Sequence, residues 1–228
     1  MSIFAIADLH LSRAPGLEKP MDVFGDRWHD HEERIKYSWC NEIDENDTVV
    51  VPGDISWGLK MEEAVYDLDW IDALPGKKIL LKGNHDLWWT GINKLNQMYD
   101  SIRFLQYDSV TVEGVSICGS RGWITPDDDD FTESDDKIYK RELLRLESSL
   151  KAAESDEIIG FLHFPPVSDP RRFSGFMQLF EDYGVKDVYY GHIHGEEGFK
   201  SAIKGNYHGI NYHLISADYL NCKPIKIR

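Results

Sequence analysis

The chain has 228 residues and a formal net charge of −15, from 40 acidic and 25 basic residues. This length suffices for one α/β core and is short for two full domains, so we expect a single domain over residues 1–228. The acidic charge disfavours non-specific binding to nucleic acid. Three widely spaced cysteines without a C-x-x-C pair are typical of reduced thiols in a cytosolic protein.

Short, mostly apolar runs predict strands that are buried on both faces: residues 3–7, 48–52, 78–82, 158–162 and 187–190. The first run follows Met1 without a basic leader, so we expect a core strand there and not a signal peptide. No apolar run approaches the roughly 20 residues that span a bilayer. We therefore expect a soluble, cytoplasmic protein without a membrane partner.

Helical stretches lie between these runs, several with apolar residues at three- and four-residue spacing: residues 27–43, 61–74, 92–99, 135–153 and 175–183. Such alternation predicts right-handed crossovers and a mostly parallel sheet, whose ligands bind beyond the carboxyl ends of the strands. Alternating segments that turn on Gly or Asn predict antiparallel strands in a second sheet: residues 103–106, 109–112, 115–118 and 207–227.

Each buried run ends at a group of metal-ligating residue types: Asp8-Leu9-His10, Gly53-Asp54, Gly83-Asn84-His85-Asp86, His163, and Gly191-His192-Ile193-His194. Mixed carboxylate and imidazole ligands suit Mn²⁺, Fe or Zn²⁺, whereas an all-oxygen set would suit Mg²⁺ or Ca²⁺. Two such ions at about 3.5–4 Å can hold a hydroxide between them and clamp a phosphoryl group. The ordered set therefore predicts a two-metal site.

The order D-x-H, G-D, G-N-H-D, H, G-H-x-H resembles that of the calcineurin-like metallophosphoesterases, from Asp8 to His194. The resemblance implies a two-sheet α/β/β/α sandwich. It also implies how two divalent ions are held: one by Asp8, His10 and His194, the other by Asn84, His163 and His192, with Asp54 bridging. Spacing alone does not divide these ligands between the ions.

The activity that the resemblance implies is hydrolysis of a phosphate ester by a metal-bound hydroxide that attacks phosphorus, on a small or medium phosphorylated substrate. His85 would face the scissile ester, stabilise the oxyanion and donate a proton to the leaving group. Asp86 would orient His85 and raise its pKa; the alternative is that Asp86 caps a following helix. The alternatives to this activity are a nuclease subunit whose partner supplies a basic groove, and a non-catalytic binding module on the same fold.

Secondary candidates each have two interpretations. Arg121 could clamp a phosphate or form a surface salt bridge, and Arg171 and Arg172 could form a basic rim or be solvated charges. Four tryptophans near the motifs could form an aromatic wall or pack in the core: Trp57, Trp88, Trp89 and Trp123. The acidic run 127–136 could cap the next helix or form a lid. The oligomeric state stays open.

Overall fold

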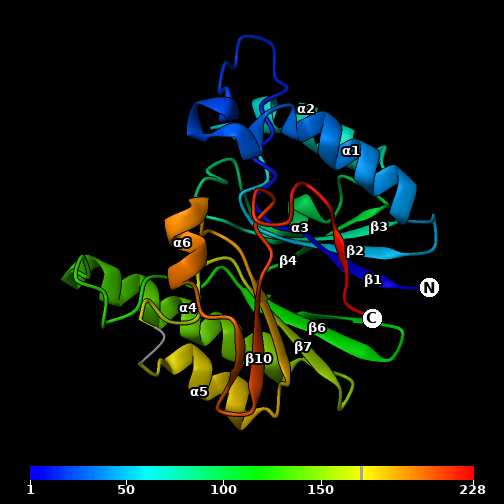
Figure 1. Ribbon diagram of the computed structural model, residues 1–228. Helices are drawn as coiled ribbons and strands as arrows, with labels where there is room; N and C mark the ends of the chain where they lie inside the picture. Colours follow the sequence, from blue (N-terminus) through cyan, green and yellow to red (C-terminus); the bar gives the residue numbers. More distant parts are fainter. Residues whose placement is uncertain (170–171) are drawn as a thin grey trace.

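Two β-sheets pack face to face at the centre of the computed structural model, which describes residues 1–169 and 172–228. Helices cover the outer face of each sheet (Figure 1). The strand orders are β11-β1-β2-β3-β4 in the first sheet and β5-β6-β7-β8-β10-β9 in the second. This arrangement is the α/β/β/α sandwich that the sequence resemblance implies.

The first sheet is parallel except at one edge. Its parallel strands are β1 (Ile3–Ala5), β2 (Thr48–Pro52), β3 (Lys77–Leu81) and β4 (Ile102–Leu105), and β11 (Ile225–Lys226) pairs antiparallel with β1. This pairing brings the two ends of the chain close together (Figure 1). The connecting helices are α1 (His31–Glu42), α2 (Met61–Asp72) and the single turn α3 (Ile92–Leu95).

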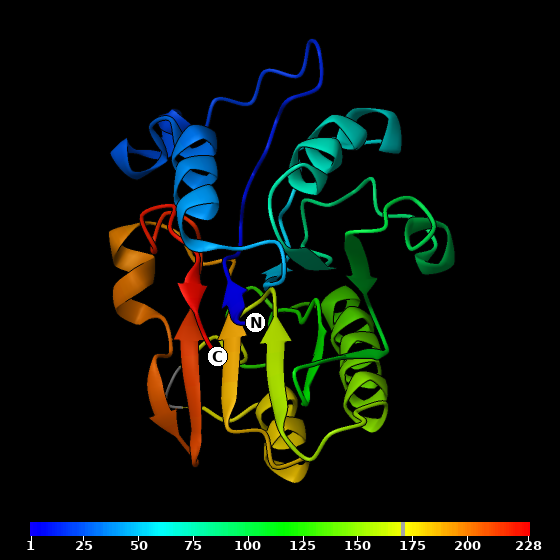
Figure 2. The same ribbon diagram turned by 90° about the vertical axis from the view of Figure 1, so that its right-hand side faces the viewer.

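The second sheet repeats this design with antiparallel strands at both edges. Its parallel strands are β6 (Val115–Ser120), β7 (Ile158–Leu162), β8 (Asp187–Tyr190) and β10 (Ile210–Leu214), and its edges are β5 (Ser109–Val112) and β9 (Gly205–Tyr207). The arrows of β7, β8 and β10 point the same way in Figure 2. The helices of this half are α4 (Glu133–Lys151), α5 (Gly175–Asp182) and α6 (Gly195–Ser201).

The predicted division of strands between the sheets is wrong. Strands β7 and β8 do not join β1, β2 and β3, and β4 lies parallel to β3 in the first sheet. An apolar run indicates that a strand is buried on both faces. Strands of both sheets are buried in this way, so composition does not identify the partner strand. The helix predicted over 27–43 begins only at His31, because 3-10 turns occupy Met21–Phe24 and Asp26–Trp28.

Side chains of each strand alternate between two apolar layers, as extended backbone requires. On β2, Val50 packs between the two sheets, whereas Val49 and Val51 pack beneath the helices of the first half. On β7, Ile159 and Phe161 likewise face the space between the sheets. The apolar layer between the sheets holds the strands rigidly, so the loops at their carboxyl ends start from fixed positions.

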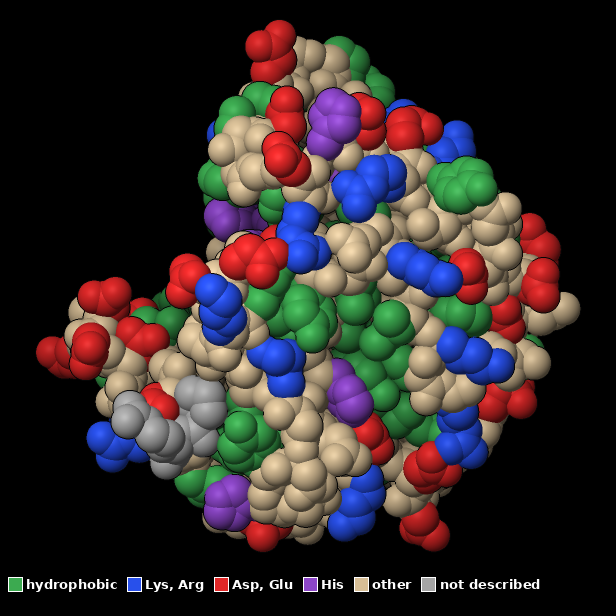
Figure 3. Space-filling model, in the orientation of Figure 1, with side chains coloured by type: hydrophobic (Ala, Val, Ile, Leu, Met, Phe, Trp, Pro, Cys, Tyr) green, Lys and Arg blue, Asp and Glu red, His purple; other side chains and the backbone are tan. Residues whose placement is uncertain are grey.

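The end of the acidic run 127–136 forms the first turn of α4 and caps that helix, with Thr132 as the N-cap residue. The Asp135 carboxylate accepts a hydrogen bond from the Thr132 backbone N–H at 3.0 Å, and Asp136 pairs with Lys140 one turn later. This confirms the predicted capping role. Acidic side chains gather at this end of α4 on the face seen in Figure 3. Within the described residues, no helix combines the length and the apolar character that a bilayer crossing requires.

Candidate metal centre

The loops after β1, β2 and β8 hold four of the predicted ligands in left-handed backbone. The φ angles are 61° for Asp8, 46° for His10, 52° for Asp54 and 70° for His192. Residues other than glycine adopt this conformation infrequently, and it concentrates at functional sites. Backbone hydrogen bonds of 3.0 Å join Asp8 N to Gly53 O and His10 N to Asp54 O. The β1 and β2 loops therefore run side by side and turn their polar side chains toward one place.

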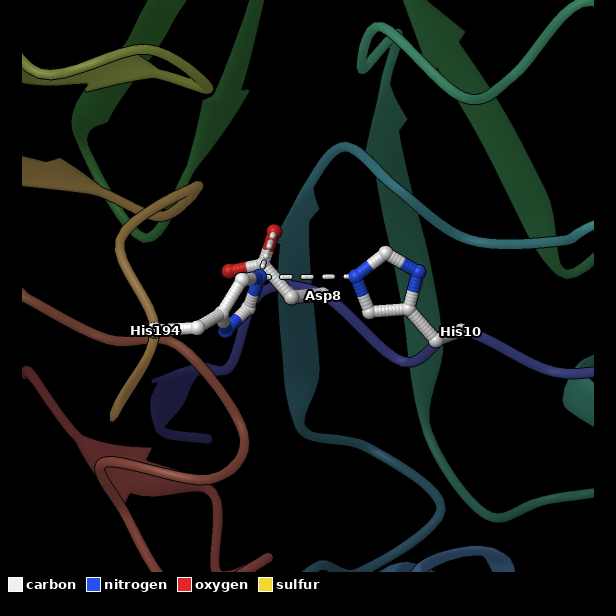
Figure 4. Close-up of side chains that lie close together, drawn as sticks. All are labelled: Asp8, His10 and His194. Carbon is white, nitrogen blue, oxygen red and sulfur yellow. Dashed lines mark hydrogen bonds and ion pairs between the residues drawn. The ribbon is translucent and has the colours of Figure 1, made fainter. Parts of the chain in front are cut away.

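Two clusters of ligand atoms form there. The ligand atoms of Asp8, His10 and His194 lie within 4.8 Å of one another, and so do those of Asp54, His163 and His192. In the first cluster, His10 Nε2 and His194 Nε2 face each other at 3.5 Å, beside the Asp8 carboxylate (Figure 4). These three side chains come from the β1 and β8 loops, which are remote in sequence and adjacent in space.

Asp54 lies between the clusters. Its Oδ2 is 3.4 Å from His163 Nε2 in one cluster and 3.9 Å from His10 Nε2 in the other. Asn84 joins the second cluster, with Oδ1 2.7 Å from His163 Nε2. The seven predicted ligand side chains therefore converge, and their grouping in space is the one that the sequence resemblance implies.

Two of the histidine rings are oriented by hydrogen bonds at Nδ1, the ring nitrogen that does not face the clusters. His163 Nδ1 lies 3.1 Å from the carbonyl oxygen of Pro52, and His194 Nδ1 lies 2.9 Å from Asp218 Oδ1. Each Nδ1–H donates to its oxygen, so Nε2 of each ring faces the centre. The buried Asp218 also accepts a hydrogen bond from Gly195 N at 3.1 Å.

Asp218 was not among the predicted site residues, because it lies in the segment 207–227 that was expected to form antiparallel strands. The only signal was position, since Asp218 follows β10 by four residues, and β10 alternates apolar and polar side chains instead of forming an apolar run. Trp28 was also missed, and nothing in the sequence distinguishes it from other buried tryptophans. Its ring lies edge-on to His10 and to His194, with centroids 5.5 and 5.3 Å apart.

The clusters fit divalent cations because hydrogen-bond acceptors converge in them. The Nε2 atom of a neutral His163 carries a lone pair, and it faces the oxygens of Asn84 and Asp54. Such an arrangement requires a positive charge, either a proton or a metal ion. Burial lowers the pKa of His192 to about 3, so its lone pair is free for a metal. Oxygen and imidazole donors together suit Mn²⁺, Fe or Zn²⁺.

The charge balance of the carboxylates agrees with this fit. Burial alone would raise the pKa of Asp54, but the nearby His163 and His10 hold it below its ordinary value. Burial alone would lower the pKa of His163, and Asp54 outweighs that effect and raises it to about 9. In the first cluster, burial raises the pKa of Asp8 to about 6 even though His194 and His163 oppose it. The buried negative charges thus need cationic partners.

Motif glycines allow the loops to approach each other this closely. A Cβ atom on Gly83 would lie 2.1 Å from Asp54 Oδ1, and one on Gly191 would lie 2.4 Å from Asp8 Oδ2. Real Cβ atoms do not make contacts that short. The glycines that accompany the ligands in the motifs therefore make room for carboxylates contributed by other loops.

Asp86 has a different role from both that were predicted. Among the described residues, its carboxylate accepts hydrogen bonds of 2.7–3.2 Å from the backbone N–H groups of Gly83, Asp54, Ile55 and Ser56 and from the indole N–H of Trp88. Neither oxygen is directed to the His85 ring, and α3 begins at Ile92 with Gly91 as its N-cap. Asp86 thus ties the β3 loop to the β2 loop and positions Asp54.

His85 lies beside the clusters and outside both of them. Its backbone N–H donates to Asp54 Oδ1 at 2.8 Å, and its ring Nε2 is 4.0 Å from Asp54 Oδ2. The side chain is 42% exposed, and its ring centroid is 4.4 Å from that of Trp57. Burial lowers the pKa of His85 although Asp54 opposes the shift, so the predicted rise caused by Asp86 is wrong.

A cavity of about 350 Å³ opens beside His85 and the clusters. One part of its wall is polar and consists of His10, Asp54, His85, His192 and His194. The rest consists of Gly195 and four apolar side chains: Met21, Phe24, Trp28 and Trp57. Of the four tryptophans considered in the sequence, only Trp57 lines this cavity. Trp88 and Trp89 pack in the core beneath the helices. The acidic run 127–136 does not line the cavity, which gives no support to a lid.

The phosphate clamp predicted at Arg121 is not at this cavity. The Arg121 guanidinium pairs with the fully buried Glu142 of α4 at 3.3 Å and stacks on Trp123, 4.4 Å from its centroid. The Arg121 side chain is only 12% exposed, so this is not a surface salt bridge either. Arg172 lines a separate cavity near Tyr139, and Arg171 lies outside the described residues.

Comparisons with solved structures agree with this fold. The crystal structure of a protein of unknown function, AQ665, from Aquifex aeolicus has 18% sequence identity to this chain and a TM-score of 0.55. That of phosphopantetheinyl hydrolase from Mycobacterium tuberculosis has 15% sequence identity and a TM-score of 0.57. Each alignment covers 99% of this chain and 95% of the other. At such identities, these two structures establish the fold alone.

Sequence comparison carries the family assignment. The Gene 66 protein of Mycobacterium phage L5 is 33% identical over 82 residues, an alignment that spans 35% of this chain and 37% of that protein. The family model of the calcineurin-like phosphoesterases matches residues 1–196, which include all seven converging ligand side chains. With two His/Asp clusters at the carboxyl ends of its strands, the chain belongs to the calcineurin-like phosphoesterase family.

Proposed function

We propose that this chain is a metal-dependent hydrolase that cleaves a phosphate ester in a small or medium phosphorylated molecule. The observation that supports this most directly is the pair of His/Asp clusters joined by Asp54 and open to one cavity. When bound, two divalent cations would neutralise phosphoryl oxygens and lower the pKa of a water molecule to about 7, so that it can attack phosphorus.

The side chains have separate tasks in this proposal. Asp8, His10 and His194 would hold one cation, and Asn84, His163 and His192 would hold the other. Asp54 would contact both, and its position depends on the hydrogen bonds that Asp86 accepts from the β2 loop. Mn²⁺, Fe and Zn²⁺ are the cations that this donor set favours.

His85 is the proposed general acid. Its ring is outside both clusters and borders the cavity, where it can donate a proton to the departing oxygen of the ester. Burial lowers its pKa in the absence of substrate. A bound phosphoryl group adds negative charge beside the ring and favours its protonated form. Substrate binding therefore favours uptake of a proton from solvent by His85, and this is the proton that passes to the leaving oxygen.

Titration of chelator-treated protein with Mn²⁺, Fe²⁺ or Zn²⁺, followed by a substrate panel, tests the proposal. The panel compares p-nitrophenyl phosphate, bis(p-nitrophenyl) phosphate, cyclic nucleotides and pyrophosphate. We expect hydrolysis of at least one ester that rises with metal and saturates near two ions per chain. His213→Ala is a matched control. The Nε2 atom of this histidine lies 2.9 Å from Asp187 Oδ1, and the residue does not line the cavity.

Other results would redirect the proposal. Full hydrolysis in metal-free protein would contradict it. Binding of two ions without hydrolysis of any ester would favour a non-catalytic binding module, and hydrolysis restricted to nucleic acid with an added partner would favour a nuclease subunit. Arg and Lys are absent from the described residues that line the cavity, so no observation favours the nuclease alternative.

A further inference from the structure

The cavity beside the metal centre has a polar wall and an apolar wall. The apolar wall consists of Met21, Phe24, Trp28 and Trp57, which belong to the β1–α1 connection and to the β2 loop. Met21 and Trp28 are buried, at 5% and 3% exposure, but Phe24 is 67% exposed. An aromatic side chain that lines a cavity and yet remains in water is available to a ligand.

The apolar wall has a fixed position relative to His85. The Trp57 ring is 4.4 Å from the His85 ring and stacks on His10 at 5.0 Å. Met21 Sδ lies 3.3 Å from Trp57 Nε1, which links the β1–α1 connection to the same wall. An apolar group bound here therefore lies next to the proposed acid, on the side where the leaving group departs.

The charges around this wall limit what can bind. Among the described residues that line the cavity, Asp54 is the only acidic one and none is Arg or Lys. The ammonium of the exposed Lys19 lies over the Trp57 ring, 5.6 Å from its centroid. A second phosphate or a carboxylate on the substrate would have only the solvent-exposed Lys19 as a cationic partner, where an ion pair contributes little, and it would lose hydration against the apolar wall. One phosphoryl group can be neutralised by the metal centre, and the rest of the substrate meets apolar surface.

We propose that the wall of Met21, Phe24 and Trp57 is a leaving-group subsite for a flat, uncharged, aromatic group, so that the substrate is a singly phosphorylated ester of an aryl-type alcohol. This inference rests on the proposed phosphoesterase function. Aromatic rings prefer offset or edge-to-face contacts with other rings, and Phe24 and Trp57 offer both a free ring and a fixed one. Phe24 is the specificity-determining residue.

Binding of two phosphonates to the Mn²⁺-loaded chain tests the subsite without turnover. Phenylphosphonate and methylphosphonate carry the same anionic group and differ in the aryl ring, and calorimetry gives Kd for each. We expect phenylphosphonate to bind about tenfold more tightly, the factor for roughly 55 Å² of apolar surface removed from water. Phe24→Ala should abolish this preference, and Phe173→Ala should retain it, because Phe173 is exposed and does not line this cavity.

A second measurement separates the subsite from the phosphoesterase proposal. Calorimetry with 1-naphthol and the metal-free chain probes the apolar wall alone, and Phe24→Ala should weaken this binding while Phe173→Ala does not. Hydrolysis of esters with equal affinities for both phosphonates overturns the subsite and leaves the proposed function intact. Naphthol binding that depends on Phe24, without hydrolysis of any ester, supports the wall and contradicts the proposed function. Naphthol binding that is unchanged in Phe24→Ala overturns the subsite.

Discussion

Asp218 Oδ1 lies 2.9 Å from Nδ1 of His194, so a buried carboxylate orients one histidine of the first metal cluster. The hydrogen bond raises the pKa of His194 even though burial would lower it. It also keeps Nε2 directed toward Asp8 and His10. A carboxylate behind a histidine ligand increases the basicity of the ring and fixes its tautomer, which strengthens metal binding.

Replacing this carboxylate should weaken metal binding without unfolding the chain. We expect Asp218→Asn to lower the affinity for Mn²⁺ about 10–100-fold, the usual effect of losing such a partner. An amide also places a donor near Gly195 N, which now donates to Asp218 Oδ2. Calorimetric titration gives the affinity, and Asp187→Asn is the control because Asp187 pairs with His213 at the other end of its strand. Affinity within twofold of the wild type would contradict the assigned role.

His85→Ala should separate metal binding from turnover. The ring is outside both clusters, so the variant should retain two ions per chain by metal analysis. Turnover should fall about 10²–10⁴-fold, the contribution of a positioned general acid. The loss should be smaller for p-nitrophenyl esters, whose leaving group needs little protonation. A variant that loses an ion would show that His85 is a ligand instead.

Asp54→Asn should lower metal occupancy and turnover together. Asp54 Oδ2 is within 4 Å of a histidine in each cluster, and removing its charge leaves two neighbouring cations with less screening. The fold should survive, because β2 is held by apolar packing of Val49, Val50 and Val51. Circular dichroism and metal content on one preparation check both statements. Two tightly bound ions with near-normal turnover would exclude a bridging role.

Asp67 should make stability depend on pH independently of the metal ions. It is buried, accepts hydrogen bonds from Ser56 Oγ and from Arg13 N, and burial raises its pKa from 3.8 to about 6 despite these bonds. A group whose pKa is higher in the folded state binds its proton more tightly there. Its contribution to the free energy of unfolding is therefore largest below about pH 4 and falls as the pH rises to about 6.

Asp67→Asn removes this titration. The stability of the variant relative to the wild type should rise by up to about 3 kcal/mol between pH 4 and pH 7, the equivalent of about two pKa units. Urea unfolding of chelator-treated protein at both pH values gives the difference. Hydrogen bonds lost in the variant change its free energy of unfolding equally at pH 4 and pH 7, so this effect cancels in the difference between the two pH values. A difference that is the same at the two pH values would contradict the raised pKa.

Part of the centre could be predicted because its ligands follow buried strands. Asp8, Asp54 and His163 each come directly or almost directly after an apolar run, and the carboxyl ends of parallel strands are where loops meet. The same logic fails for Asp86, whose type and position suit catalysis equally well. Only the distances show that its two oxygens are occupied by backbone N–H groups.

Of the apolar half of the cavity, Trp57 was considered in the sequence as part of an aromatic wall, and Met21, Phe24 and Trp28 were not predicted. Phe24 and Trp57 are separated by β2 and α1 in the sequence, and neither belongs to a motif. Their proximity depends on how the β1–α1 connection folds back over the metal centre, which includes the contact of Met21 with Trp57. Without the folded structure, nothing distinguishes Phe24 from other apolar residues that lie singly on a protein surface.

The residue types at the ends of buried strands can be read directly along the chain, and the resemblance that they carry implies the family, the two-sheet sandwich and the donor set of the clusters. Strand burial and motif order depend on residues that are close together in the sequence, so they can be recognised without the folded structure. Only the folded chain shows which strands share a sheet, that Asp218 supports His194, and that Arg121 pairs with Glu142 away from the cavity. Those outcomes depend on contacts between segments remote in sequence, because the same side chain makes different bonds according to the neighbours that packing brings to it.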